Sequence, residues 1–467
     1  MDMTTPDFIH FLFDDGSFQE MHKVETGGDT AVIVGIGNIS GKATYLIADF
    51  PGNEVPKDFF IITKKKVEFL KFVRKNPHPL VVFLNRATQL SASESSKLYV
   101  PKGSGRTLMD GDGIGRYFSE LGLLSGQVPS VAIVAGDMSA GFVFPASFCD
   151  ACLFIRGTHI ALAGAVAVEK IVGKKVNVEE LSGAEMHCKV SGTGDFIMND
   201  YQEAAEWVKK YFSYLPNHYL ESAPHLVFDQ VNMPEELKHE VLPFETRQAF
   251  DMKEVIKGLV DKNSFFELKA DYASEIVTGF ARIEGRSIGF VGNNSMVRFG
   301  AIYPESCRKI AKFSTVCDAF GLPLVFLADT PGFMVGQEIE QKGVIKHATL
   351  VLSALAGIEV LKIFVVIRKA YGGGIFVMSG PGFADKSFVL PKAIVGPFGT
   401  EVMIEPRSVE ERAGYQELKE LNSPQKLVEN GYIDEIVEWK NLRKKLSNVF
   451  QNEKVSAPKH IKKILSF

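Results

Sequence analysis

Residues 360–379 read VLKIFVVIRKAYGGGIFVMS. The apolar, largely β-branched run Ile363 to Ile367 predicts a buried strand, and three glycines, Gly372 to Gly374, predict a sharp turn that leads into a helix. A turn without side chains lets a ligand oxygen approach backbone N–H groups at a helix N-terminus, where the helix dipole favours negative charge. The stretch therefore predicts an oxyanion hole, although a plain tight turn would also use glycines.

The first half of the chain contains a similar stretch. Residues 129–142 read PSVAIVAGDMSAGF, and aligning them with the later stretch places Ala140 on Gly372 and Gly141 on Gly373. Two more pairs follow in order, namely PLVVFL (79–84) with PLVFL (323–327) and ISGK (39–42) with IEGR (283–286). Ordered matches of this kind indicate one ancestral domain used twice. We expect domains at 1–215 and 251–467, joined by a proline-containing linker at 216–250.

Composition excludes several classes of function. Of the 467 residues, 46% are hydrophobic and 23% are charged, so the chain can bury large cores. The formal net charge of −4 provides no general attraction to nucleic acid or to an anionic membrane. Residues 348–367 are apolar, but they read as a buried helix, a turn and a strand, so no membrane span is expected.

The cysteines and the N-terminus bear on the compartment. Five cysteines are scattered along the chain, unlike a disulfide framework, and Cys149 and Cys152 read as two buried thiols rather than metal ligands. The first residues lack the basic flank of a signal peptide, and no transit peptide is evident. We expect a cytoplasmic protein, or a mitochondrial-matrix protein if the source is eukaryotic, and no metal site.

Periodicity and turn residues predict the remaining elements. Helices are expected at 57–75, 114–125, 200–215, 252–260, 303–320, 406–422 and 442–450, strands at 80–84, 131–134 and 322–327, and hairpins at 31–48 and 277–292. The basic run at 64–66 reads as a solvated helix face, and 88–113 as a long, mobile surface loop. Asp329, at a strand end, is placed to orient the Pro331–Gly332 turn.

Four motifs carry a resemblance to the biotin-dependent acyl-CoA carboxyltransferase family. They are LSGAEMHCKVSG (181–192), GAIYPESCRKIAKF (300–313), DTPGFMVGQEIEQKG (329–343) and RKAYGGGIFVMSGP (368–381). That family includes the beta-type subunits of acetyl-, propionyl- and methylcrotonyl-CoA carboxylases and the carboxyltransferase subunit of glutaconyl-CoA decarboxylase. The resemblance covers about 31–437. It implies an α/β fold of tandem, duplicated crotonase-like domains with the ClpP/crotonase ββα superhelix.

The resemblance also implies roles for the two turns. In the family, an acyl-CoA loses an α-proton and its thioester oxygen becomes an enolate oxygen, while the ureido oxygen of biotin gains charge as the carboxyl group leaves. Carried onto this chain, Ala140 and Gly141 face the thioester oxygen and Gly373 and Gly374 face the ureido oxygen. The domain 1–215 is then the acyl-CoA side and 251–467 the biotin side. The liberated biotin nitrogen is the expected base.

Three residues beside the turns are the expected substrate contacts, Phe142 in the first half and Ile375 and Phe376 in the second. Phe142 adds bulk directly after the first turn. Propionyl-CoA-type relatives often carry a Tyr-Asp pair where this chain has Ile375 and Phe376, so the acyl group stays open. The usual Ser-Gly-Gly-Ala segment is replaced here by residues 86–89, RATQ, which weakens any assignment of coenzyme A contacts.

The resemblance implies partners as well. The chain shows neither an Ala-Met-Lys-Met biotin-attachment motif nor an ATP-binding phosphate loop, so a biotin carboxyl carrier protein and a biotin carboxylase are expected to be separate chains. A homo-oligomer, hexamer or dimer, would bring the first domain of one subunit to the second domain of another. Three alternatives remain open, namely a decarboxylase subunit running the same half-reaction backwards, a biotin-free crotonase-type hydratase or isomerase, and a non-catalytic assembly subunit.

Overall fold

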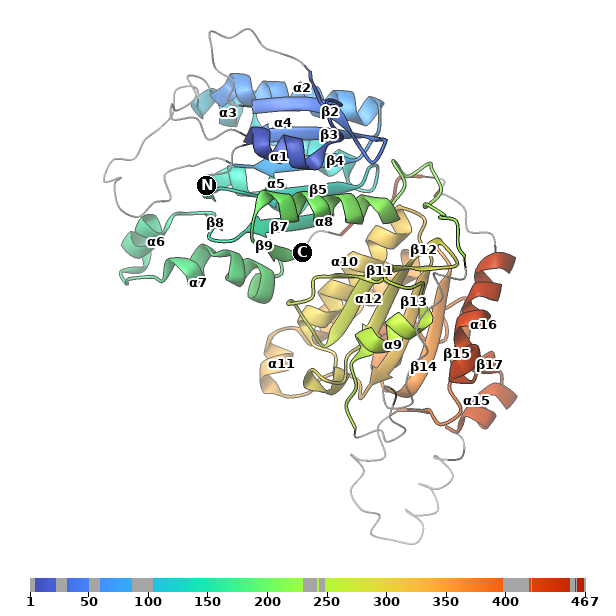
Figure 1. Ribbon diagram of the computed structural model, residues 1–467. Helices are drawn as coiled ribbons and strands as arrows, with labels where there is room; N and C mark the ends of the chain where they lie inside the picture. The colour runs from blue at the N-terminus through green and yellow to red at the C-terminus, as the bar shows by residue number, and fades with distance from the viewer. Residues whose placement is uncertain are drawn as a thin grey trace. The chain divides into compact units, whose positions relative to one another are not determined.

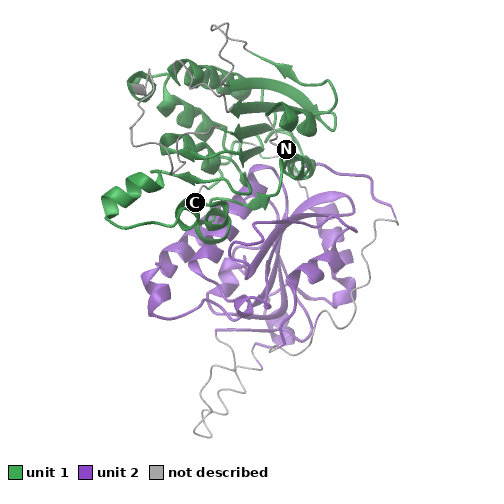
Figure 2. Ribbon diagram, turned by 60° about the vertical axis from the view of Figure 1, so that its left-hand side comes forward, with its two compact units in different colours: residues 1–222, 458–467 green, residues 223–457 purple. Residues whose placement is uncertain are grey.

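The computed structural model describes residues 5–21, 32–49, 59–85, 104–229, 242, 248–397, 420, 422–453, 458 and 460–465. The chain forms two compact units, Met1–Ser222 together with Pro458–Phe467, and Ala223–Ala457 (Figure 2). Unit 2 thus begins inside the stretch expected to be a linker. The first residues of unit 2 already contact the turn of its hairpin at 283–286, because the Leu226 N–H donates to the Gly285 carbonyl at 2.9 Å.

Unit 1 is built on a seven-stranded sheet in the order β1-β2-β3-β4-β5-β7-β9 (Figure 1). Its strands are β1 (Gln19–Glu20), β2 (Val32–Ile39), β3 (Lys42–Asp49), β4 (Leu80–Leu84), β5 (Ser130–Val134), β7 (Ala151–Ile155) and β9 (Phe196–Met198). The pairs β1–β2 and β2–β3 are antiparallel, and all pairs from β3 to β9 are parallel. Two short strands, β6 (Met138–Ser139) and β8 (Ile160–Ala161), form a separate parallel pair.

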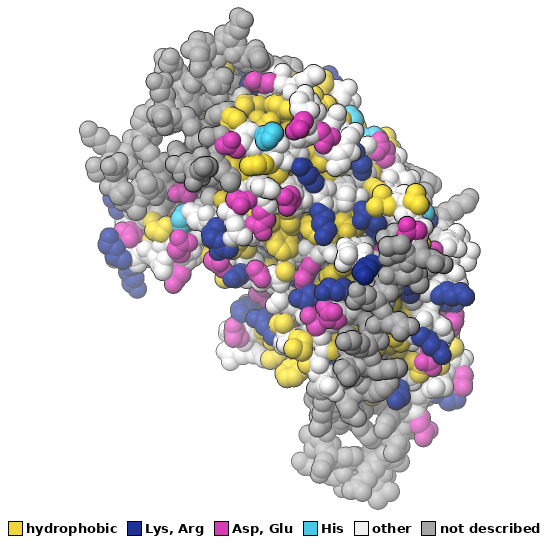
Figure 3. Space-filling view, viewed as in Figure 1, with side chains coloured by type: hydrophobic (Ala, Val, Ile, Leu, Met, Phe, Trp, Pro, Cys, Tyr) yellow, Lys and Arg dark blue, Asp and Glu magenta, His cyan; other side chains and the backbone are white. Residues whose placement is uncertain are grey.

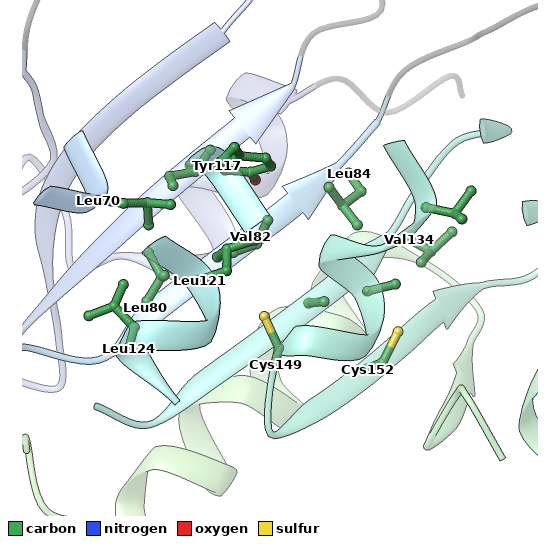
Figure 4. Packing of buried hydrophobic residues seen from close by; sticks show 14 of the residues in the cluster. Leu70, Leu80, Val82, Leu84, Tyr117, Leu121, Leu124, Val134, Cys149 and Cys152 are labelled. Carbon is green, nitrogen blue, oxygen red and sulfur yellow. The ribbon is translucent and has the colours of Figure 1, made fainter. Parts of the chain in front are cut away.

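Most helices of unit 1 lie in the crossovers between parallel strands, whereas the first precedes β1 and the last follows β9. The helices are α1 (Thr5–Leu12), α2 (Phe59–Lys75), α3 (Ser104–Met109), α4 (Ile114–Leu124), the 3₁₀ helix η1 (Ala140–Val143), α5 (Pro145–Phe148), α6 (Ala165–Val172), α7 (Val178–Ser182), the π-helix η2 (Met186–Ser191) and α8 (Tyr201–Tyr214). Figure 4 shows Tyr117, Leu121 and Leu124 of α4 directed at Val82 and its strand neighbours. Each such buried apolar side chain contributes about 2 kcal/mol to folding.

Unit 2 repeats this plan. Its eight-stranded sheet runs β10-β11-β12-β13-β14-β15-β17, with β16 pairing to the end of β14. The strands are β10 (Phe266–Leu268), β11 (Ile276–Ile283), β12 (Arg286–Asn293), β13 (Leu324–Thr330), β14 (Lys362–Tyr371), β15 (Lys386–Val389), β16 (Ile394–Gly396) and β17 (Glu435–Ile436). The helices are α9 (Met252–Leu259), η5 (Arg298–Gly300), α10 (Pro304–Ala319), α11 (Gln337–Gln341), α12 (Val344–Gly357), α13 (Gly374–Val377), α15 (Pro424–Glu429) and α16 (Trp439–Asn452).

Alternating side chains of the unit 2 sheet bury both of its faces. Val277 and Ala281 of β11 join a core cluster with residues of α9 and α16, whereas Phe280 points the other way and lies 5.5 Å, centroid to centroid, from Phe313 of α10. This period of two is what a strand geometry requires. The predicted α/β fold is confirmed.

Matching hairpin turns show the duplication at atomic detail. The Asp14 carboxylate accepts hydrogen bonds from the N–H groups of Ser40 at 3.0 Å and Gly41 at 2.8 Å. In unit 2, the Asp261 carboxylate accepts the corresponding pair from residues 284 and 285 at 2.9 and 2.7 Å. Both turns consist of two residues at positive φ, the conformation of a tight two-residue hairpin.

Most predicted elements are confirmed within a few residues, including both hairpins, the helices now labelled α2, α4, α8, α9, α10 and α16, and the strands β4, β5 and β13. The apolar stretch 348–367 forms α12, a turn and β14, as expected. Cys149 and Cys152 are buried thiols. Among the residues described, no helix combines the length and apolar character needed to cross a membrane.

One predicted surface was wrong. The basic run at 64–66 is not a solvated face, because α2 packs against the sheet and two of these lysines are directed inward. Lys66 is buried and its Nζ lies 2.6 Å from Asp49 Oδ1, and Lys65 Nζ donates to the Val32 carbonyl at 2.8 Å. Only Lys64 stays at the surface, beside Glu68. On the face shown in Figure 3, basic and acidic side chains are interspersed.

Two other predictions fall partly or wholly outside the described residues. The expected loop at 88–113 is described only from 104, and there it begins with α3 rather than with irregular chain. The segment 86–89 lies outside the described residues, as does almost all of the helix expected at 406–422.

Candidate active site: two backbone turns

The glycine turn of unit 2 begins where β14 ends. Gly372 adopts a φ of 55°, and its N–H donates to the carbonyl of Gly396 in β16 at 2.9 Å. A side chain at this position would be strained by the backbone conformation, and its Cβ would lie 3.1 Å from the Pro397 carbonyl oxygen. Glycine at 372 therefore lets the chain turn from the strand straight into α13.

Two N–H groups of this turn are available to a ligand. The N–H groups of Ile375 and Phe376 donate to the carbonyls of Gly372 and Gly373, both at 3.2 Å. The first N–H groups of a helix have no acceptor within the helix. Among the described residues, we find no acceptor for the N–H of Gly373 or of Gly374. The turn therefore has two adjacent unengaged donors, of which Gly373 is exposed and Gly374 is buried.

Close packing explains why these two donors are glycines. A Cβ on Gly374 would lie 2.9 Å from Cα of Gly332 and 3.1 Å from Cγ2 of Thr330, distances that leave no room for it. A Cβ on Gly373 would lie 3.0 Å from the ring of Phe333, which is a movable side chain. The glycine turn thus rests directly on the neighbouring Thr330–Gly332 turn.

The Thr330 hydroxyl ties that neighbouring turn together. Its Oγ1 donates to the Gly300 carbonyl at 2.9 Å and accepts from the Gly332 N–H at 3.1 Å. Asn293 supports the same carbonyl through Nδ2 at 3.2 Å, and its Oδ1 accepts from the Asp329 N–H at 3.2 Å. The loops that follow β12 and β13 are therefore fixed to each other by the side chains of Asn293 and Thr330, which are themselves buried.

A buried ion pair lies at the base of the same turns. Arg368, in β14, donates from Nη2 to Asp329 Oδ2 at 2.8 Å and from Nε to Oδ1 at 3.2 Å. Its Nη1 donates to the Gln248 carbonyl at 2.6 Å, and its guanidinium lies 4.3 Å from the centroid of the Phe250 ring. Asp329 thus orients the strand that carries the glycine turn as well as the Pro331–Gly332 turn.

The first turn has the same construction. Ala140 opens η1 at a φ of 57°, close to that of Gly372, and its N–H donates to the Leu162 carbonyl at 3.2 Å. The partner again comes from the segment that pairs beside the turn, here just after β8. The alignment of Ala140 with Gly372 made from the sequence therefore places two residues with the same backbone geometry and the same type of partner.

The donors of the two turns differ in number. Because Leu162 takes the N–H of Ala140, the remaining early donor of η1 is Gly141, for which no acceptor is found among the described residues. A Cβ on Gly141 would lie 3.3 Å from Cδ1 of Ile114 and 3.5 Å from the ring of Phe118, both on α4. Ala140 and Gly141 thus share one turn, in which Gly141 offers the open N–H.

The three expected substrate contacts lie beside these turns. Phe142 is partly buried, with its ring centroid 5.8 Å from that of Phe59. Ile375 is partly buried, and Phe376 is 44% exposed. A side chain exposed to this extent does not pack into the core beneath the glycines.

His159, which the sequence analysis did not identify, is hydrogen-bonded to residues just before the first turn. The His159 backbone N–H donates to Asp137 Oδ1 at 2.9 Å, and the ring lies between Asp137 and Glu179, at 3.2 Å from Nδ1 and 2.9 Å from Nε2. Its carbonyl accepts from the Met138 N–H at 2.9 Å. Burial alone lowers the pKa of His159, but hydrogen bonds and charges of the two carboxylates outweigh it and raise the pKa. The sequence did not indicate this role, because the two carboxylates lie 22 and 20 residues from His159 along the chain.

Within the described part of the chain, no group of three or more histidine, cysteine or acidic residues is arranged to hold a metal ion. The groups that the two turns themselves offer are backbone N–H donors. Such donors stabilise negative charge that develops on an oxygen.

Comparison with known proteins identifies the family. A model of the carboxyl transferase domain matches residues 3–464. The chain belongs to the carboxyl transferase domain family. This family match agrees with the resemblance drawn from the four motifs.

Individual members of the carboxyl transferase family resemble the chain over most of its length. YngE of Bacillus subtilis, described as an uncharacterized carboxylase, is 36% identical over 72% of this chain and 68% of its own length. The propionyl-CoA carboxylase beta chain of Roseobacter denitrificans is 29% identical over 98% and 92%. The structure of transcarboxylase 12S, solved with hydrolysed methylmalonyl-coenzyme A bound, superposes with a TM-score of 0.85 at 28% identity and covers 99% of this chain and 92% of that one. The crotonase-like fold is thereby confirmed.

Proposed function

We propose that this chain is a carboxyltransferase subunit that moves a carboxyl group between carboxybiotin, held on a separate carrier protein, and a short or branched acyl-CoA. The observation that carries the proposal is the unengaged pair of N–H groups at Gly373 and Gly374, together with a turn in unit 1 where Ala140 has the backbone φ of Gly372 and Gly141 has an unengaged N–H. Membership of the carboxyl transferase family and the names of the relatives support it.

Each turn has a distinct part in the proposed reaction. In unit 1, the acyl-CoA side, the Gly141 N–H faces the thioester oxygen as it becomes an enolate oxygen, and the left-handed Ala140 sets the bend. In unit 2, the biotin side, Gly373 and Gly374 face the ureido oxygen. Biotin, when bound, would supply the carboxyl group and a basic nitrogen. One well-placed donor to such an oxygen is worth about 100- to 1,000-fold in rate.

The residues present suit a ureido group. The donors at Gly373 and Gly374 are adjacent and unengaged, Gly373 is exposed, and the turn beneath them is fixed by buried side chains. A preorganised pair of donors requires no rearrangement as charge develops. Phe142, Ile375 and Phe376 would border the acyl group, as in the sequence-based assignment.

Partners follow from the same proposal. The carboxyl group would arrive on a biotin carboxyl carrier protein loaded by a biotin carboxylase, both separate chains. We also propose a homo-oligomer in which unit 1 of one subunit faces unit 2 of another, because a two-fold axis then joins unlike turns twice. The hexamer assembly named for transcarboxylase 12S supports this arrangement. Whether carboxylation or decarboxylation dominates would depend on the partner chains.

The test is exchange of carboxyl label between malonyl-type CoA thioesters and free biotin. We expect label to pass in both directions with at least one short or branched acyl-CoA. Dehydration or double-bond shift of enoyl-CoA substrates without any exchange would contradict the proposal and would favour the hydratase or isomerase class instead.

A further inference from the structure

A strained loop lies next to the glycine turn of unit 2. Arg298, Phe299 and Gly300 are three consecutive residues at positive φ, 48°, 55° and 72°. Two of them are not glycine, and L-residues with side chains seldom adopt this conformation. Such strain persists only where the surrounding structure enforces it, and it is concentrated at functional sites.

The enforcing contacts come from both ends of the loop. At its C-terminal end, the Gly300 carbonyl accepts from Asn293 Nδ2 at 3.2 Å and from Thr330 Oγ1 at 2.9 Å. A Cβ on Gly300 would lie 2.7 Å from the Asp329 carbonyl oxygen, so the chain is in close contact with the β13 end. The loop is thus fastened to the same threonine that supports the glycine turn.

At the N-terminal end, the Arg298 side chain is anchored. Its guanidinium lies 4.3 Å from the centroid of the Tyr303 ring, and Nη1 lies 3.6 Å from Oε2 of the buried Glu275. The other oxygen of Glu275 accepts from the Ser306 hydroxyl at 2.5 Å. Contacts of both neighbouring residues therefore hold the backbone of Phe299 in this conformation.

The loop presents Phe299 to solvent rather than to the core. Its side chain is 69% exposed, an unusual position for a phenyl ring in so fixed a loop. Three residues later, Cδ1 of Ile302 lies 3.3 Å from where Gly374 would carry a Cβ. The Ile302 carbonyl accepts from the N–H of Met334, which is itself 42% exposed. Ile302 itself is buried against Gly374, and Phe299 and Met334 are the exposed apolar side chains of the two segments that meet there.

We infer that Phe299 is a substrate-contact residue, whose ring forms the apolar wall against which the fused rings of biotin lie while Gly373 and Gly374 bind the ureido oxygen. Biotin has one polar ureido edge on an otherwise largely apolar bicyclic body, and a site for such a ligand combines apolar side chains with a few placed donors. The inference rests on the proposed function. It also explains why the strain is kept at 299, where glycine would relieve it.

Replacement of Phe299 by glycine distinguishes a role of the ring in binding biotin from a role in folding. Glycine adopts a φ of 55° without strain, so Phe299→Gly should fold with an unchanged or higher melting temperature. The KM for free biotin in the exchange reaction should rise about tenfold or more, while the KM for acyl-CoA stays the same. Phe299→Tyr, which keeps an aromatic ring, should restore most of the affinity.

Asn263→Gly is the matched control, because Asn263 also has positive φ, 59°, but lies at an exposed turn before β10. It should leave both KM values unchanged. A folded Phe299→Gly enzyme with an unchanged KM for free biotin overturns the inference and leaves the proposed function intact. Failure of the parent chain to exchange label with any malonyl-type CoA overturns the proposed function, and this inference with it.

Discussion

Arg368 and Asp329 meet through two parallel contacts, Nη2 to Oδ2 at 2.8 Å and Nε to Oδ1 at 3.2 Å, and the side chains are only 5% and 0% exposed. Each lies near the end of a strand that leads into one of two touching turns. Two-point arginine–carboxylate pairs fix direction as well as distance. The pair therefore fixes the orientation of β13 and β14 relative to each other at the points where the two turns begin.

Asp329→Ala should lower the free energy of unfolding by about 3–5 kcal/mol, because it leaves a buried guanidinium charge without its partner. Urea denaturation measures this loss. Glu338→Ala is the control, since Glu338 pairs with Lys342 on an exposed helix and its removal should leave the melting temperature essentially unchanged. Equal stability of Asp329→Ala and the parent chain would show that the pair does not hold the turns.

Thr330→Val should impair the glycine turn while keeping the shape of the side chain. The substitution removes the acceptor of the Gly332 N–H and one of the donors to the Gly300 carbonyl, and it should cost about 1–3 kcal/mol of stability. Thr330→Ser keeps the hydroxyl and should retain most of the exchange rate. A Thr330→Val enzyme with the parent kcat would argue against the hydroxyl as a positioning group.

The position of the His159 ring between the carboxylates of Asp137 and Glu179 predicts that the stability of the fold depends on pH. The folded-state pKa is raised above the ordinary value near 6.5, so protonation is favoured by folding. This contribution is fully present below the unfolded pKa and is lost as pH rises through the folded pKa. Across about pH 5.5 to 9, the melting temperature of the parent chain should fall relative to that of His159→Gln. A constant difference between the two proteins would mean that Asp137 and Glu179 do not stabilise the imidazolium.

Phe376→Ala should change substrate preference rather than stability. With 44% of its surface exposed, the Phe376 side chain contributes little to the core. The ratio of exchange rates should shift toward bulkier, branched acyl-CoAs by about tenfold, the usual scale of discrimination by apolar contacts. Ile375→Val, a smaller change at the adjacent residue, serves for comparison. A well-folded Phe376→Ala enzyme with an unaltered ratio would remove Phe376 from the acyl pocket.

Local sequence patterns were sufficient to predict the duplication and most helices and strands of the fold. The repeated β-branched runs and glycine turns lie within single strand-and-turn segments, so the sequence displays them directly. The matching aspartates were missed, because DDGSF (14–18) and DKNSF (261–265) share too few residues to stand out. The two aspartates are equivalent because each accepts hydrogen bonds from a hairpin that lies further along the chain. Asp14 and Ser40, for example, are 26 residues apart.

The details of the candidate site depend on long-range pairing, which a sequence does not display. Ala140 could be aligned with Gly372, but the engagement of its N–H by Leu162 follows from the pairing of β6 with β8. The inward turn of Lys65 and Lys66 likewise depends on where α2 meets the sheet. Strain at Phe299 follows from hydrogen bonds made by Asn293 and Thr330.

In the proposed reaction the backbone N–H of Gly373 stabilises charge on a ligand oxygen, and a proline at this position lacks that N–H. Gly373 has a φ of −63°, which matches proline, and Gly373→Ala provides the control because it adds the same Cβ near Phe333 but keeps the N–H. Both variants should have melting temperatures close to each other. The kcat for carboxyl exchange between a malonyl-type CoA and biotin should fall about 100- to 1,000-fold in Gly373→Pro and far less in Gly373→Ala. Equal kcat values for the two folded variants would contradict the account.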